Sequence, residues 1–186
     1  MTIPPPPPDH IDGVVTAGPA DTAHLARMIE TGFVRAAATR QNTALTRAGC
    51  GLAAAAFWPL LPAAVTLQLG LVLRPGTRYY LSADREAVLA VGVRRDAWHV
   101  HAHVSTRPGT GQGRALRALV GPALAAAADA SGTPVEAVAI SRAMADRYAT
   151  EFPGLVDVGA GFPQGRRLRR EPRPGRGGPW ERRRSA

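Results

Sequence analysis

Apolar and polar positions along the first third of the chain predict a short strand followed by two helices. Residues 12–18 are typical of a short edge strand. The next segment predicts a helix in which Asp21 is the N-cap and Leu25, Met28 and Phe33 lie on one face. A second helical pattern ends near Gly49.

The second half of the chain alternates strand-like and helix-like patterns. An apolar stripe at i, i+3 and i+4 predicts a helix over 111–132, although Pro122 should bend or break it. The other expected elements are strands over 77–81, 87–93, 97–105, 135–140 and 155–159, with a helix over 141–152. This order predicts an α/β (α+β) domain with one mixed central β-sheet flanked by helices.

The segment between Arg47 and Arg74 is the longest stretch without charge. Its 26 residues are enough to cross a bilayer. Two prolines and Gln68 argue against a crossing, and residues 65–73 alternate with the period of a strand. We therefore expect a buried helix or loop followed by a buried strand, with a membrane segment as the less favoured alternative.

Charge is concentrated at the C-terminal end. All 23 basic residues are Arg and the net charge is +9, but nine of these Arg, against two Glu, lie in residues 165–186. The other end begins with five consecutive prolines at 4–8. We expect a disordered Pro-rich leader over 1–11, a single domain over 12–163 and a disordered basic tail over 164–186. Such a tail could bind nucleic acid or another anionic partner weakly and non-specifically.

Cysteine content limits the chemistry and the compartment. The single cysteine, Cys50, excludes an intramolecular disulfide and a cysteine-based metal cage. The first residues lack the apolar core of a secretory signal. We expect a cytoplasmic protein with no metal cofactor.

A glycine-rich loop between a strand and a helix is the most informative local feature. Gly109, Gly111 and Gly113 allow close approach to the backbone, and Arg114 adds positive charge in the first helical turn. The loop lacks the Lys-Ser/Thr pair of a Walker A motif, and its spacing is not G-x-G-x-x-G. The pattern indicates either a pyrophosphate site or a plain glycine turn.

The run from residue 87 to 159 resembles the acyl-CoA-binding half of the GNAT N-acyltransferase superfamily. Residues 111–116 match that family's G-x-G-R-x-L segment, although Pro108 stands where the family has Gln or Arg. After the next strand, Tyr148 follows Ser141 by seven positions, as in the family's N-x-x-A-x-x-x-Y pattern, with Ser in place of Asn.

The resemblance implies a GNAT-like domain that transfers an acyl group from acetyl-CoA directly to a primary amine of a small molecule or protein. It implies that Tyr148 protonates the CoA thiolate. It also implies an acyl-CoA site formed by Val104, Gly109, Thr110, Gly111, Gln112, Gly113, Arg114 and Ser141.

Histidines on the strand 97–105 are candidates for the base. His99, His101 and His103 alternate, so we expect them to share one face, with His103 nearest the loop and His101 as second candidate. A polar sheet face and a three-histidine zinc site are alternatives. The alternative function is a non-enzymatic interaction protein, a degenerate GNAT-like domain whose Arg-rich tail binds nucleic acid or an acidic partner.

Overall fold

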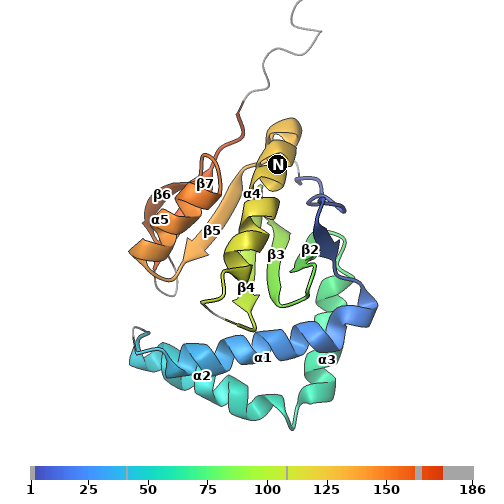
Figure 1. Cartoon of the computed structure of the whole chain (residues 1–186), viewed down its shortest axis with the longest axis vertical. Helices are drawn as coiled ribbons and strands as arrows, with labels where there is room; N and C mark the ends of the chain where they lie inside the picture. Colours follow the sequence, from blue (N-terminus) through green and yellow to red (C-terminus); the bar gives the residue numbers. More distant parts are fainter. Residues whose placement is uncertain (1–2, 41, 108, 162–164, 174–186) are drawn as a thin grey trace, which may run out of the picture.

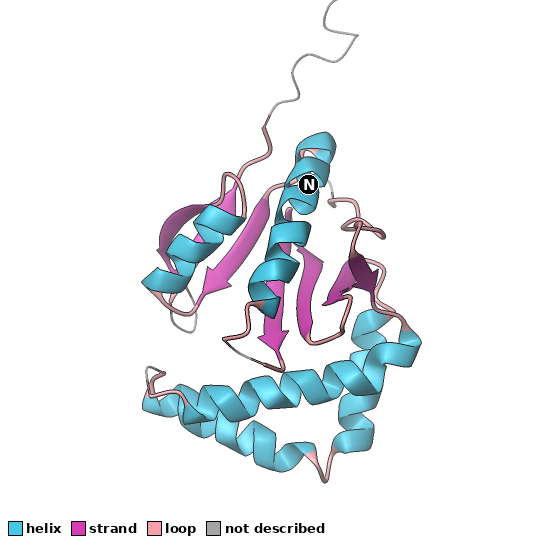
Figure 2. Ribbon diagram, in the orientation of Figure 1, coloured by secondary structure: helices cyan, strands magenta, loops and turns pink. Residues whose placement is uncertain are grey.

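The computed structural model describes residues 3–40, 42–107, 109–161 and 165–173, and within them seven strands form one sheet (Figures 1 and 2). The strand order is β1-β2-β3-β4-β5-β7-β6, and only β4 and β5 pair in parallel. The strands are β1 (Val14–Thr16), β2 (Thr77–Ser82), β3 (Ala87–Arg94), β4 (Ala97–Ser105), β5 (Val135–Ala139), β6 (Val156–Ala160) and β7 (Arg166–Arg170). The expectation of a mixed central sheet is confirmed.

Helices cover both faces of this sheet. They are α1 (Thr22–Ala38), α2 (Ala44–Phe57), α3 (Leu61–Val72), α4 (Gln112–Ser131) and α5 (Arg142–Glu151), with a 3-10 turn η1 (Pro19–Asp21) before α1. One core contains Leu89, Val91 and Trp98 of the sheet and the apolar stripe of α4. A second core on the opposite face contains Val88 and Ala90 with side chains of α1 and α3.

A smaller third cluster packs α5 against β5 and β7. It contains Ala137, Ala145 and Leu168, and it shares Val100 and Phe152 with the α4 core. The helices α4 and α5 therefore lie on the same face of the sheet, with α1 and α3 on the other.

Two sequence expectations about helices are wrong. Residues 65–73 were expected to form a buried strand, but α3 is a helix, and Leu67 and Leu73 are exposed. The break expected at Pro122 is also absent, because α4 continues through it to Ser131. Gly121 places α4 against the end of α5, since a Cβ there would lie 2.8 Å from the Glu151 carbonyl oxygen.

The two ends of the chain were expected to be disordered, but residues of both ends pack against the domain or form part of its sheet. In the leader, the carbonyl oxygen of Pro5 accepts a 2.7 Å hydrogen bond from Trp98 Nε1, and Pro8 accepts one from Tyr80. At the other end, residues 166–170 form β7 between β5 and β6. The boundary expected at residue 163 is therefore too early; the tail beyond 173 lies outside the described residues.

No single described helix is long and apolar enough to span a membrane. The pair α2 and α3 together has sufficient length and apolar character, but the two helices are bent by 106° relative to each other.

Candidate functional site

A groove opens where β4 and β5 separate. These parallel strands pair only from Trp98 and Val135 to Val100 and Ala137, while β4 continues to Ser105 and β5 to Ala139. The groove at this opening has a volume of about 1110 Å³. Its walls come from α1, α2, the end of β4, the loop and first turn of α4, and α5 (Figure 1). Parallel strands that diverge leave backbone groups available to a ligand inserted between them.

The glycine loop lies at one wall of this groove and leads into α4. Gly109 and Gly111 have φ angles of +87° and +84°, a conformation that favours glycine. Gly111 is the N-cap of α4, so the first amide groups of that helix face the groove without intrahelical acceptors. Helix amides, the dipole and the exposed Arg114 together provide a suitable environment for a pyrophosphate.

Most of the residues expected to bind acyl-CoA line the groove. Val104, Gly109, Gly111, Gln112, Gly113 and Arg114 do so, but Thr110 and Ser141 are not among its lining residues. Thr110 donates a 2.6 Å hydrogen bond to the Arg107 carbonyl oxygen, and the Ser141 hydroxyl caps α5 by accepting from the Met144 amide. Pro108, the departure from the family pattern, lies outside the described residues.

A β-bulge separates the histidines of β4. Val88 pairs with Val104 and Ala90 with His101, so one residue of β3, Leu89, opposes two residues of β4. The extra residue reverses the alternation of side chains after His101. His103 therefore faces α4 and α5, whereas His101 faces the α1 side.

The opposite placement of His101 and His103 corrects the expectation that His99, His101 and His103 share a face. His101 packs beside Tyr79, with ring centroids 6.4 Å apart, and stacks on His99 at 6.0 Å. It is not in the groove and is not placed to act with His103. The three-histidine zinc site is excluded by the same geometry.

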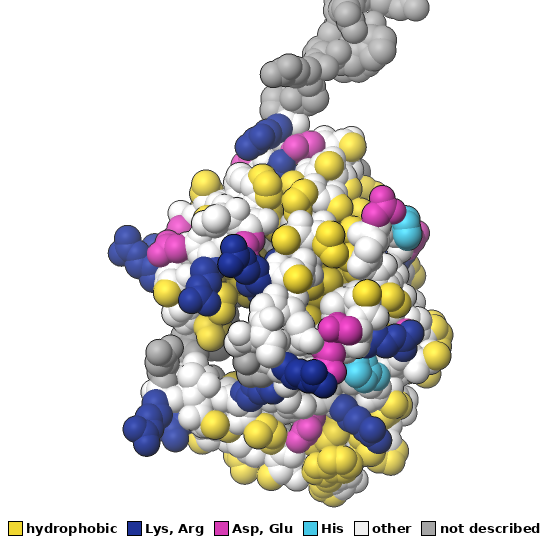
Figure 3. All heavy atoms as spheres, viewed as in Figure 1, with side chains coloured by type: hydrophobic (Ala, Val, Ile, Leu, Met, Phe, Trp, Pro, Cys, Tyr) yellow, Lys and Arg dark blue, Asp and Glu magenta, His cyan; other side chains and the backbone are white. Residues whose placement is uncertain are grey.

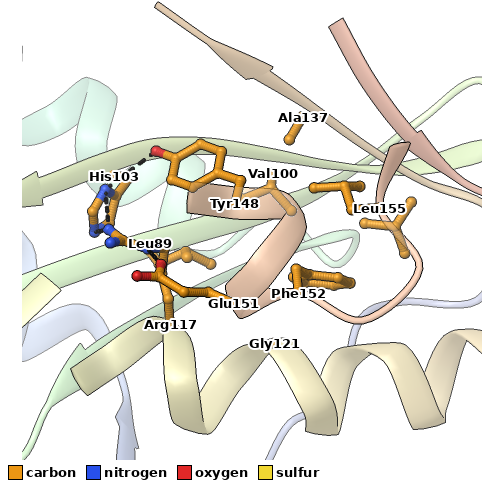
Figure 4. Close-up of a pocket in the computed structure, with 11 residues that line it drawn as sticks. Leu89, Val100, His103, Arg117, Gly121, Ala137, Tyr148, Glu151, Phe152 and Leu155 are labelled. Carbon is orange, nitrogen blue, oxygen red and sulfur yellow. Dashed lines mark hydrogen bonds and ion pairs between the residues drawn. The ribbon is translucent and has the colours of Figure 1, made fainter. Parts of the chain in front are cut away.

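The structure brings together His103 and Tyr148, the two residues that the sequence analysis named as candidate base and acid. The Tyr148 hydroxyl lies 3.4 Å from Nδ1 of His103, and the rings meet edge to face (Figure 4). A Cβ at residue 113 would lie 2.8 Å from Nε2 of His103, so the glycine at the start of α4 makes room for the imidazole.

Arg117 and Glu151 complete this cluster, and sequence reasoning did not find them. The Arg117 guanidinium pairs with the Glu151 carboxylate, and each side chain is 13% exposed. The same guanidinium donates to His103, with Nη1 2.9 Å from Nε2, and lies 5.2 Å from the centre of the Tyr148 ring. No local pattern predicted this pair, because it forms only where Gly121 lets α4 and α5 approach.

The environment sets the protonation of the two central groups. Burial, followed by the positive charge of Arg117, lowers the pKa of His103 to about 4. Burial also raises the pKa of the Tyr148 phenol, while Arg117 opposes that rise. At neutral pH the cluster therefore holds a neutral imidazole, able to accept a proton, beside a protonated phenol, able to donate one.

A small apolar cavity of about 30 Å³ lies behind the cluster. Leu89, Val100, Ala137, Phe152 and Leu155 form its apolar lining, with Tyr148 and His103 at one side (Figure 4). The apolar wall excludes water from one side of the cluster, which strengthens the hydrogen bonds within it.

The chain is similar to known proteins in its structure and not in its sequence. No family model matches the sequence, and no curated protein matches it. Among solved structures, the PaiA N-acetyltransferase from Thermoplasma acidophilum, in complex with coenzyme A, is 8% identical, with a TM-score of 0.55 over 85% of this chain and 97% of that chain.

Two further acetyltransferase structures are similar. "Histone acetyltransferase HPA2 and related acetyltransferase" from Corynebacterium glutamicum has a TM-score of 0.55 at 14% identity, over 92% of this chain and 98% of that chain. RimL, a ribosomal L7/L12 α-N-protein acetyltransferase, has a TM-score of 0.53 at 11% identity, over 86% of this chain and 91% of that chain. These similarities confirm the predicted resemblance: the chain has the GNAT acetyltransferase fold.

Proposed function

We propose that this protein is an acyl-CoA-dependent N-acyltransferase that transfers an acetyl group to a primary amine. The observation that carries the proposal is the groove between the diverging β4 and β5. A helix N-terminus stands on one wall and His103 on another, and the Tyr148 hydroxyl lies 3.4 Å from His103, at the edge of the small apolar cavity. The fold adds support, because similar solved structures are acetyltransferases and one of them contains coenzyme A.

In the proposed complex, the amide groups at the start of α4 and Arg114 hold the pyrophosphate of acetyl-CoA. The pantetheine arm extends between β4 and β5 toward His103, beside which the Tyr148 hydroxyl lies. These residues fit the cofactor because glycines keep side chains away from the phosphate position and the positive helix end faces it. The thioester then lies at the polar cluster, next to the acceptor amine.

The transfer is direct in this proposal. The amine nitrogen attacks the thioester carbonyl carbon, a C–N bond forms, and the C–S bond breaks. The departing thiolate takes the proton of the Tyr148 hydroxyl. The proton released by the amine passes through the neutral imidazole of His103, which does not retain it because its pKa is about 4. The proton then goes to water in the groove or back to the Tyr148 phenolate, which restores the phenol. A direct transfer needs no covalent enzyme intermediate.

The first test is ligand binding by thermal unfolding of the full chain with and without acetyl-CoA. A ligand at about one hundred times its dissociation constant adds roughly 2.7 kcal/mol to the free energy of unfolding. We expect a clear rise in Tm that Gly113→Leu abolishes, because a large side chain there would enter the space of His103. Gly49→Leu is the control, since a Cβ at residue 49 meets nothing and the position lies outside the groove. Absence of a shift in the wild-type protein would overturn the proposal.

The second test is turnover. Release of the CoA thiol from acetyl-CoA would be measured with a panel of primary amines and of peptides that have a free amino terminus. Release that depends on the amine and falls strongly in Tyr148→Phe supports the proposed acid. Binding of acetyl-CoA with no release for any amine class would leave a cofactor-binding protein without transferase activity.

A further inference from the structure

The surface of the α2–α3 pair carries large apolar side chains that the described part of the chain leaves uncovered. Of the thirteen exposed large hydrophobic residues in that part, eight lie between Phe33 and Leu73. Leu52 is 73% exposed, Leu67 is 67% exposed and Trp58, at the corner between the helices, is 61% exposed. In Figure 3 apolar side chains gather along the lower edge, where Figure 1 places α2 and α3. An apolar surface of this extent is typical of an interaction site.

The segment that forms this surface carries charge of a single sign. Between Glu30 and Asp84 the chain has no Asp or Glu, but it has five Arg. Of these, Arg40, Arg47 and Arg74 are exposed. The surface therefore attracts an anionic partner.

The same charge pattern disfavours a second copy of this chain. A two-fold interface brings the same patch of both copies together, so each copy would bring its arginines to the other's arginines. No acidic residue within this segment is available to pair with them. An apolar surface whose own segment contributes arginines and no carboxylates fits a partner with an apolar layer beneath anionic groups, which is the surface of a lipid bilayer.

The geometry of the helix pair indicates contact with the surface rather than a crossing. α2 and α3 together have the length and composition of a membrane segment, but the 106° bend prevents a straight path through a bilayer. Tryptophan at the bend has the amphipathic ring that favours the membrane interface.

We propose that the α2–α3 pair docks on an anionic lipid surface. Leu52, Trp58 and Leu67 insert into the boundary between headgroups and acyl chains, while the exposed arginines contact the anionic headgroups. The proposal does not depend on acyl transfer, because binding alone tests it.

The test is co-sedimentation of the full chain with large vesicles of phosphatidylcholine alone or mixed with phosphatidylglycerol. We expect binding to the mixed vesicles and at least tenfold weaker binding to phosphatidylcholine alone. The double variant Leu52→Glu/Leu67→Glu should bind the mixed vesicles at least tenfold more weakly. Leu119→Glu is the matched control, because Leu119 is an exposed leucine on α4, away from α2 and α3. This variant should bind the mixed vesicles as the wild-type protein does.

Two further variants separate the alternatives. Trp58→Gln, at the exposed corner, should also weaken binding, which provides a second test if the double variant fails to fold. The triple variant Arg182→Gln/Arg183→Gln/Arg184→Gln neutralises the C-terminal end. Binding that is lost in the triple variant and kept in Leu52→Glu/Leu67→Glu would overturn the proposal. So would a stable dimer in light scattering that Leu52→Glu/Leu67→Glu converts to a monomer, together with no vesicle binding.

Discussion

Two arginines on α4 face the same carboxylate, and their surroundings predict very different effects on stability. Arg117 is 13% exposed and its Nε donates to Glu151 Oε2. Arg114, one turn earlier, is 80% exposed and its Nε lies 3.9 Å from Glu151 Oε1. Replacing Arg117 leaves a mostly buried carboxylate without its main partner and removes a donor from His103. Replacing Arg114 removes an interaction that solvent already screens.

The expected magnitudes follow from this difference in burial. Breaking a buried ion pair by removing one partner costs about 3–5 kcal/mol, and the remaining exposure of Glu151 places Arg117→Gln at about 3 kcal/mol. For a chain of this size that corresponds to a Tm lower by roughly 6–12 °C. Arg114→Gln should cost less than about 1 kcal/mol.

Urea unfolding followed by circular dichroism measures both variants, at low and at high salt. The effect of Arg117→Gln should persist at high salt, because the pair is shielded from solvent ions. Arg117→Met/Glu151→Leu should recover part of the loss, since two apolar side chains leave no unpaired buried charge. The reasoning is refuted if Arg117→Gln lowers the free energy of unfolding no more than Arg114→Gln does.

Four further predictions follow from individual residues. Tyr148→Phe should lower amine-dependent thiol release about 10²–10⁴-fold and preserve the Tm shift with acetyl-CoA; an unchanged rate would remove Tyr148 as the acid. Because the pKa of His101 and of His103 in the folded protein is about 4, below the ordinary 6.5, the unfolded chain binds more protons between these values. The free energy of unfolding in urea should therefore fall as pH drops from about 6.5 to 4. The fall should be less steep in His101→Gln than in the wild-type protein, and equal slopes would contradict the lowered pKa of His101. Gly111→Ala, at φ +84°, should cost about 1–2 kcal/mol in the same assay, and no loss would contradict the left-handed N-cap. Gly70→Ala, in open space on α3, should gain about 0.5–1 kcal/mol, and a loss would argue against the helix.

The elements that sequence reasoning predicted well are those with a clear period or a clear boundary. The strands at 77–81, 87–93 and 97–105 and the helix over 111–132 agree with β2, β3, β4 and α4 within one residue at most boundaries. In α4 the apolar stripe persists over five turns, and glycines stand at both ends. The resemblance rested on the segment 111–116 and on the Ser141–Tyr148 spacing, which lie at the start of α4 and along α5.

The segment 61–72 shows why an apolar run without charge is ambiguous. Nearly every position is apolar, so the pattern fits a period of 2.0 and a period of 3.6 equally well. In the sequence Pro62 was an argument against a membrane crossing. In the structure it stands in the first turn of α3, where the missing amide hydrogen costs no helix hydrogen bond. Its position at a helix start was the signal available in the sequence.

The placement of His103 could not be read from spacing, because a bulge adds one residue without any local mark in the sequence. Strict alternation puts His101 and His103 on one face. In the structure the two histidines lie on opposite faces, because the register of β3 against β4 shifts by one residue between them. The same irregularity turns His103 toward Tyr148. The candidate site therefore depends on a tertiary feature that a single strand's pattern does not contain.

The arginine-rich end was read as a disordered tail for a related reason: charge was counted along the chain and not across the sheet. In β7, Arg166 pairs with Asp157 of β6, Arg169 with Glu136 of β5, and Arg170 with Asp129 of α4. Arg170 is only 2% exposed, a position that an arginine tolerates because Asp129 and the Pro153 carbonyl oxygen accept from it. These three arginines are engaged within the domain. Their charge stabilises the last strands of the sheet, and binding of an anionic partner through residues 165–186 would depend on the remaining arginines of that segment.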